Sequence, residues 1–297
     1  MDASAAPAQN ALLLRPPHAL DPWLSAGIGV AFDGAAGDLQ CHFPAVLGSG
    51  LVLVLEGALG LHDGMRLHPL PAAFVSGPAT SPVTLYRTPR LRCIAVMVRP
   101  AGAAALLGDT PEALVDGIAD ARAVFGPRWN TWMERIGHAR GDAARIGRLF
   151  DFVWDTVGGE QRHAARRISG AQLQHAALRG TPGTPQTGGY SRRHFERLFS
   201  AHFGLRPKLF QRLARTEAAL RDLLAGGCCG ADLAMRHGYF DQSHLGRDLR
   251  AFAGAPAGTL LSAVQASAPA YWPLLVGASY GRAGLRADFG DAVSHFS

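Results

Sequence analysis

The sequence predicts an α+β fold, in which a small β-barrel or β-sandwich precedes a domain made only of helices. Two observations support this prediction. Short apolar runs bounded by Gly or Pro fill residues 20–100, whereas apolar residues recur three and four positions apart in most later segments. The chain has 297 residues, 48% of them hydrophobic and 18% charged, so it is long enough for two domains and has the composition of a globular protein.

The expected strands follow one another as hairpins. LVLVL at 51–55 is followed by the turn Glu56-Gly57 and by ALGLH, and the later runs are RLHPLPAAFVSGP, PVTLYRTP and LRCIAVMVRP. Many short strands at this spacing are typical of a small barrel or sandwich. Alternation alone does not show which face of each strand points inward.

Helical patterns begin after residue 100. TPEALVDGIADARAVFG (110–126) is expected to form one helix, with Thr110 as its cap and Pro111 at its first position. Residues 128–157 are also expected to be helical, with an apolar stripe that is core or a dimer seam rather than a ligand-binding surface. The stripe consists of Trp129, Trp132, Met133, Ile136, Ile146, Leu149, Phe150 and Val153. We divide the chain into an N-terminal domain (1–125), a helical linker (126–165), a C-terminal domain (166–265) and a tail (266–297).

The basic charge of the chain is concentrated in the C-terminal domain. The net charge is +6, but residues 166–265 contain 14 Lys and Arg against 6 Asp and Glu, whereas residues 1–165 contain 13 against 15. A local surplus of this kind indicates either a polyanionic partner or a solvated helix surface. The arrangement of the side chains has to decide between the two.

Two similar amphipathic helices carry much of this charge, the first capped by Ser191 and the second by Asp241. Their apolar faces consist of Phe195, Leu198, Phe199 and Phe203 in the first helix, and of Leu245, Leu249 and Phe252 in the second. Their outward side chains are Arg192, Arg193, Glu196 and Arg197 in the first helix, and Gln242, Ser243, Gly246, Arg247 and Arg250 in the second. Arginine and glutamine pair bidentately with guanine and adenine edges, and serine reaches phosphates or bases, so these faces are suited to duplex DNA.

The second of these helices is preceded by ADLAMRHGY, in which Gly238 is expected to form a tight turn. Helix, glycine turn and helix is the helix-turn-helix arrangement. Between the two units, RPKLFQRLARTEAALRDLLAGG is expected to be one continuous helix that begins near Pro207 and ends at Gly226. Its roughly 19 residues span about 28 Å, close to the ~34 Å turn of B-DNA, so the two outward helices are expected to reach successive major grooves.

The runs YSRRHFERLFSAHFGLRPKLF and LAMRHGYFDQSHLGRDLRAFAG resemble the double helix-turn-helix domain of AraC/XylS-type transcription regulators. The motif GY-x-D-Q-S-H-L-x-R is specific for that family. The preceding residues are more weakly similar to the cupin-like β-barrel domains of such regulators, in FP at Phe43, VSGP at 75–78 and VRPAG at 98–102. The resemblance implies base-facing residues at Arg192, Arg193, Glu196, Arg197, Gln242, Ser243, His244 and Arg247.

The first unit departs from the family pattern. The family places a helix just before the turn glycine, here Gly189, but RGTPGTPQTGG (179–189) contains Pro182 and Pro185, which remove donors and clash with a helical backbone. The nearest expected helix, SGAQLQHAALR, is capped by Ser169. A loop of about ten residues therefore replaces the usual tight turn, and the first DNA-contacting helix is expected to be displaced or weak.

Catalytic and metal-binding patterns are weak in this sequence. The metal-binding cupin signature needs paired histidines, but His42, His62 and His68 stand apart, so we expect neither a metal nor another cofactor. No metalloprotease, serine-hydrolase or phosphate-loop motif occurs, and we do not expect an enzyme. Four residues either line a small-molecule effector site in the barrel or point outward from their strands: Glu56, Tyr86, Arg87 and Arg92.

The favoured hypothesis is a sequence-specific DNA-binding transcription regulator, activator or repressor, whose barrel binds a small effector or serves only for dimerisation. The alternative is a cupin-type enzyme or small-molecule sensor whose helical domain no longer binds DNA. Duplex DNA is the expected partner, and a small-molecule effector, a second copy of the chain (homodimer) and RNA polymerase are further candidates. A cytoplasmic location fits four cysteines without a paired motif, and no run reaches the ~18 apolar residues of a membrane helix. These cysteines are Cys41, Cys93, Cys228 and Cys229.

Overall fold

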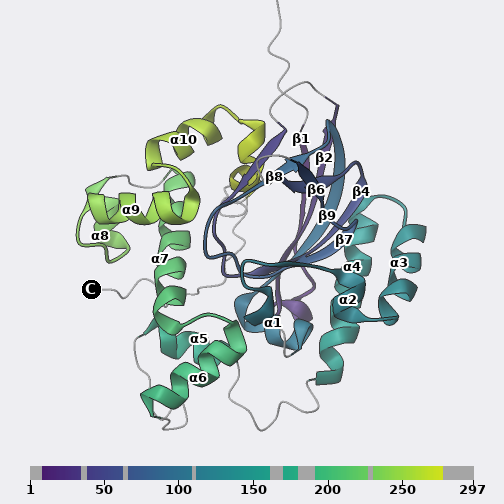
Figure 1. Ribbon diagram of the computed structural model, residues 1–297, viewed down its shortest axis with the longest axis horizontal. Helices are drawn as coiled ribbons and strands as arrows, with labels where there is room; N and C mark the ends of the chain where they lie inside the picture. The colour runs from purple at the N-terminus through teal and green to yellow at the C-terminus, as the bar shows by residue number, and fades with distance from the viewer. Residues whose placement is uncertain are drawn as a thin grey trace, which may run out of the picture.

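The chain folds into an N-terminal β-sandwich, covered by helices on one outer face, with a second group of helices beside it (Figure 1). The computed structural model describes residues 9–34, 39–62, 66–108, 112–160, 170–179, 191–226 and 230–276. The predicted α+β class is confirmed, with the strands in the N-terminal part and helices alone in the C-terminal part.

The described strands form two antiparallel sheets. The six-stranded sheet has the order β1 (Gln9–Leu14), β2 (Leu24–Asp33), β9 (Arg90–Val98), β4 (Ser49–Glu56), β7 (Ala73–Ser76) and β10 (Ile118–Asp120). The four-stranded sheet has the order β3 (Gln40–Phe43), β8 (Val83–Arg87), β5 (Leu59–His62) and β6 (Leu67–Pro69). Neither sheet closes on itself within the described strands, so the sandwich alternative holds and the expected closed barrel is not formed.

The space between the two sheets is filled by apolar side chains. The buried cluster that joins the sheets consists of Val30, Phe32, Cys41, Leu59, Phe74, Leu85, Leu91, Cys93, Trp272 and Val276. Trp272 and Val276 belong to the end of the described chain, which returns to the sandwich after the last helices (Figure 1). The Trp272 ring lies edge-on to Phe43, with ring centres 5.4 Å apart, and 6.5 Å from Phe32.

The outer face of the six-stranded sheet is covered by α4 (Asp142–Glu160), against which α3 (Arg128–His138) packs (Figure 1). The helix approaches the sheet so closely that a Cβ on Gly27 would lie 2.2 Å from Ile146. The predicted apolar stripe is buried here, with Met133 partly buried and the other members in the core: Trp129, Trp132, Ile136, Ile146, Leu149, Phe150 and Val153. The stripe is therefore core and not a dimer seam.

The single helix predicted for residues 110–126 is wrong. The described residues form a 3-10 turn, η2 (Glu112–Leu114), the strand β10 and a short helix, α2 (Ala121–Phe125). Asp116 has a left-handed φ of 54° after this turn, and β10 then pairs with β7 at the edge of the sheet. Asp120 caps α2 by accepting two backbone N–H groups. Sheet pairing thus outweighs the local helical pattern, and the expected cap residues Thr110 and Pro111 lie outside the described residues.

The remaining helices are α1 (Pro100–Leu107), α5 (Gly170–Leu178), α6 (Arg192–Phe203), α7 (Pro207–Leu224), α8 (Ala231–Arg236), α9 (Gln242–Ala253) and α10 (Ala257–Gln265), with 3-10 turns η1 (His18–Leu20) and η5 (Pro269–Tyr271). The predicted continuous helix is α7, with Pro207 in its first turn. Gly238, with a left-handed φ of 67°, turns the chain between α8 and α9, as predicted for the second unit. Among the described helices, none combines the length and the apolar character that a membrane crossing requires.

The N-terminal domain holds the C-terminal helices through two backbone donors. The N–H of Ala45 donates to the carbonyl of Phe252 at 2.6 Å, and the N–H of Leu47 donates to Glu217 Oε1 at 2.6 Å. Phe252 lies in the last turn of α9, where carbonyls have no partner within the helix. The loop at residues 45–47 therefore satisfies one end of α9 and binds the middle of α7.

We expect Trp272→Ala to lower the free energy of unfolding by about 3–5 kcal/mol, because it empties a site between the two sheets. Its indole Nε1 is buried without a hydrogen-bond partner among the described residues, so Trp272→Phe should cost much less. Trp154→Ala on α4 is the control, since that ring is 46% exposed and its loss should cost about 1 kcal/mol or less. Denaturant unfolding measures all three, and equal losses for the two alanine variants would contradict the burial of Trp272.

Candidate nucleic-acid interface

The helices α6 and α9 each begin at a side-chain cap. Ser191 Oγ accepts the N–H of His194 at 3.3 Å, and Asp241 Oδ1 accepts the N–H of His244 at 2.7 Å. Both predicted caps are thus present. They fix the first turn of each helix, which is the part that contacts bases when a helix enters a major groove.

The outer face of α9 is open to solvent. Four of its predicted site residues are exposed: Gln242, Ser243, Arg247 and Arg250. Arg247 makes no hydrogen bond or ion pair within the described chain. A Cβ on Gly246 would meet only Arg250, at 3.7 Å, so packing inside the protein does not require glycine there. His244 differs from the other predicted residues, because its half-buried ring packs edge-on against Tyr239, with ring centres 5.1 Å apart.

The outer face of α6 carries more charge, but its side chains pair with one another. Arg192 Nε lies 3.0 Å from Glu196 Oε1, and Arg197 Nη2 lies 3.0 Å from His194 Nδ1. Arg193 is exposed and has no such partner within the described residues. The helix is supported from inside by α5, whose apolar residues share one core with Phe195 of α6. The predicted loop with Pro182, Pro185 and Gly189 lies outside the described residues.

A basic groove of about 860 Å³ runs beside α6 and the start of α7. Four cationic side chains line it, together with the single carboxylate of Glu196: Arg192, Arg197, Arg206 and Lys208. Several cationic side chains in one groove suit the repeated negative charge of a phosphate backbone better than the edge of one base. Arg206 and Lys208 were not predicted from the sequence. The sequence places them at the start of a helix but does not show that they line a groove with α6.

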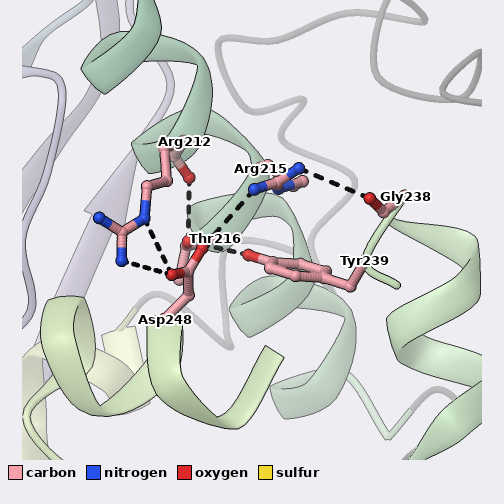
Figure 2. Close-up of polar contacts among 6 residues, drawn as sticks. All are labelled: Arg212, Arg215, Thr216, Gly238, Tyr239 and Asp248. Carbon is pink, nitrogen blue, oxygen red and sulfur yellow. Dashed lines mark hydrogen bonds and ion pairs between the residues drawn. The ribbon is translucent and has the colours of Figure 1, made fainter. Parts of the chain in front are cut away.

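A buried carboxylate fixes α9 against α7 (Figure 2). Asp248 is only 1% exposed, and its Oδ1 accepts both Nε of Arg212 at 2.9 Å and Nη2 of Arg212 at 2.6 Å. Its Oδ2 lies 3.7 Å from Arg215 Nη2, a distance for an ion pair but too long for a hydrogen bond. Two arginines one turn apart on α7 thus hold one carboxylate of α9.

The same network holds the turn before α9 (Figure 2). Arg215 donates to the carbonyl of Gly238 at 3.5 Å, and its guanidinium lies 4.4 Å from the centre of the Tyr239 ring. The Tyr239 hydroxyl lies 2.9 Å from Thr216 Oγ1, and burial raises the pKa of Tyr239. The side chains of α7 therefore position both the turn and the helix that follows it.

The sequence contains a signal for this network. Asp248 lies three residues after Leu245 and four before Phe252, on the apolar face of the predicted helix. An acidic residue on a buried stripe needs a partner, and Arg212 and Arg215 are spaced to share one face of the preceding helix. Which arginine it meets depends on how α7 and α9 cross.

Comparison with known families supports the helix-turn-helix assignment. Residues 187–263 match a family of helix-turn-helix domains. The C-terminal domain is an AraC-type helix-turn-helix domain. This match supports the role of a DNA-binding transcription regulator. No match was found among curated proteins.

Solved structures similar to the chain include three of ToxT from Vibrio cholerae. Apo ToxT K231A from strain SCE256 is 10% identical, with a TM-score of 0.42 over 80% of this chain and 97% of that chain. ToxT from strain O395 is 10% identical, with a TM-score of 0.40 over 76% and 94% of the two chains. The same protein bound to (E)-4-(8-methylnaphthalen-1-yl)but-3-enoic acid is 10% identical, with a TM-score of 0.41 over 76% and 96%. The family match, and not these structures, identifies the AraC-type domain.

The four residues predicted for an effector site do not form one site. Glu56 and Arg92 face each other on β4 and β9 and line a pocket of about 450 Å³ on the outer face of the six-stranded sheet. Arg92 also donates to Asp142 at the start of α4, and this bond raises the pKa of Arg92. Tyr86 and Arg87 lie on β8 of the other sheet, and Arg87 is buried 3.9 Å from the centre of the Phe32 ring.

His42, Cys41 and Cys93 of the sandwich make contacts that support the fold. His42 Nδ1 lies 3.0 Å from Thr84 Oγ1, and its ring packs on Tyr271. Cys41 and Cys93 are buried between the sheets, and burial raises the pKa of Cys93 to about 12. Within the described ranges, no three His, Cys, Asp or Glu side chains come close enough to hold a metal ion. The side chain of His62 and the residues Cys228 and Cys229 fall outside the described part.

We expect Asp248→Ala to destabilise the AraC-type domain by about 3 kcal/mol, because it leaves two arginines without their buried partner. Asp151→Ala is the matched control, since Asp151 forms a 3.0 Å pair with Arg148 on the surface of α4 and should cost about 0–1 kcal/mol. Chemical denaturation measures both variants. Similar values for the two would show that the Asp248 pair contributes no more than a surface pair.

Proposed function

We propose that the protein recognises a specific DNA sequence mainly through α9 and binds the phosphate backbone through α6 and the basic groove. The observation that carries this proposal is the exposed face of α9, where Arg247 has no partner within the described chain while Asp248 on the opposite face is held by α7. An arginine on a rigid helix suits bidentate contact with guanine. The half-buried ring of His244 packs edge-on against Tyr239, so less of this side chain is available to DNA than of the exposed Gln242 and Ser243.

The first unit is proposed to contribute affinity more than sequence preference. Arg192 and Arg197 would have to leave Glu196 and His194 before they contact bases, and Glu196 places a negative charge on the DNA-facing side. Contacts to phosphates tolerate such variation, since they depend on charge and not on one base edge. The displacement expected from the loop at 180–189 remains a prediction, because that loop is outside the described residues.

The N-terminal domain is proposed to control this DNA-binding domain. The donors at Ala45 and Leu47 contact α9 and α7, the two helices joined by Asp248, so a shift of this loop acts on the DNA-contacting face. A small polar effector would have Glu56, Arg92 and Asp142 as its candidate contacts. A second copy of the chain and RNA polymerase are further partners that the function implies, and we propose that the protein acts in the cytoplasm as a regulator and not as an enzyme.

The decisive experiment is selection of bound sequences from random duplex DNA with the full-length protein, followed by affinity measurements at several salt concentrations. A defined consensus, together with affinity that falls as salt rises, is the expected result. Binding without any enriched sequence would leave only non-specific affinity and would contradict the proposal.

On the selected site, Arg247→Ala is expected to weaken specific binding by about 1–3 kcal/mol and to relax the preference at one base pair. Arg148→Ala on α4 removes the same charge away from the interface and should leave both quantities nearly unchanged. Fluorescence anisotropy on the consensus and its single-base variants measures the effect. A uniform loss over all variants would assign Arg247 to a phosphate instead.

In the first unit, Arg193→Ala and Arg197→Ala are expected to cost less specificity than Arg247→Ala, while each lowers the salt dependence of binding by about one phosphate contact. The physical reason is that Arg197 is shared with His194 and lines the basic groove, and that Arg193 projects from the same helix, which we propose to lie along the phosphates. The same single-base variants provide the test. A loss of base preference at either position equal to that of Arg247→Ala would show that α6 reads bases as well.

A further inference from the structure

Phe240 is the most exposed large apolar residue in the described part of the chain. Its side chain is 93% exposed, compared with 70% for Met235 on α8 and 46% for Trp154 on α4. Scattered apolar residues are common on protein surfaces, but a phenyl ring that stands almost free of its own protein is a candidate for contact with another molecule. Its position on the AraC-type domain decides which molecule.

The backbone on both sides of Phe240 is fixed. Tyr239 is buried, its N–H donates to the carbonyl of Ala234 at 2.9 Å, and its ring lies under Arg215. Asp241 follows as the cap of α9, bonded to the N–H of His244. Because one neighbour is anchored in the core and the other is bonded to the first turn of α9, the ring of Phe240 cannot fold inward without breaking the cap or the turn.

The ring therefore lies beside the end of α9 that we propose to enter the DNA. Phe240 directly precedes Asp241 and the exposed Gln242 and Ser243 in the chain, so it lies next to the residues proposed to make polar DNA contacts. Residues at the start of a recognition helix lie nearest to the base edges. A phenyl ring offers no hydrogen bond to a base, and the apolar group that the major groove presents is the C5-methyl of thymine.

We propose that Phe240 contacts a thymine methyl group beside the bases read by α9, and so sets the preference for thymine at one position of the site. This inference rests on the proposed function, since it needs α9 in the major groove. It adds a determinant that makes no hydrogen bond and carries no charge, so its contribution is independent of salt.

The test compares two ways of removing the same contact. In the selected duplex, deoxyuridine replaces each thymidine in turn, which removes only the methyl group. One such replacement is expected to weaken binding of the full-length protein about fourfold, the ratio that corresponds to one buried methyl group. Phe240→Ala is expected to weaken binding to the thymine duplex at least as much, and to bind the thymine and uracil duplexes equally at that position. Phe240→Leu should retain part of the discrimination.

Met235→Ala is the matched control, because it removes an exposed apolar side chain from α8 and should keep the full response to deoxyuridine. Several outcomes overturn the inference. In the first, the losses in binding free energy from Phe240→Ala and from deoxyuridine are additive at every position. In the second, Phe240→Ala weakens binding equally on all sequences, as the loss of a contact with a sugar would. In the third, the variant binds DNA normally but loses transcriptional activation, as for a protein contact. If the unaltered protein selects no sequence at all, the proposed function fails together with this inference, whatever Phe240→Ala does.

Discussion

The carboxylate of Asp248 sits on the buried face of α9, where a charge without partners is strongly unfavourable. Arg212 and Arg215 supply the opposite charge from α7, and each also covers an aromatic ring, Arg212 that of Phe252 and Arg215 that of Tyr239. An apolar contact between two helices tolerates sliding, whereas this arrangement of donors and acceptor fits only one relative position. The exposed face of α9 is thereby set by contacts on its opposite side.

The N-terminal domain binds the same pair of helices that this ion pair joins. Its loop at residues 45–47 donates to the last turn of α9 and to Glu217, on α7 close to Arg212 and Arg215. The end of the described chain adds a second connection, because Trp272 is buried in the sandwich while Leu274 packs in the core of α8 and α9. A ligand that alters the sandwich would therefore have two physical routes to α9, the helix proposed to contact DNA, and linkage would require DNA to affect the binding of that ligand equally.

The two units of the DNA-binding domain differ in what their surfaces can do. On α6, Arg192 pairs with Glu196 and Arg197 bonds to His194, and both arginines line the groove with Arg206 and Lys208, which favours contact with a line of phosphates. On α9, the exposed side chains carry fewer charges and are mostly without partners among the described residues, which favours contact with individual bases. A division between backbone contacts that position the protein and base contacts that specify the site is common in DNA recognition.

The sequence by itself determined the features that depend on local chemistry. The caps Ser191 and Asp241, the turn at Gly238 and the continuous helix α7 were predictable, because each depends on residues a few positions apart. Only the tertiary structure decided features that depend on distant partners. The sequence pattern of residues 112–126 predicts a helix, yet β10 forms because it pairs with β7 at the edge of the sheet. The interior of the sandwich is completed by Trp272, which is distant in the sequence. Glu56 and Arg92 were separated from Tyr86 and Arg87 by the division into two sheets, which alternation cannot reveal. Which residues are buried and which elements pair depends on how the elements pack against one another. The residues of a single element are not sufficient to determine that packing.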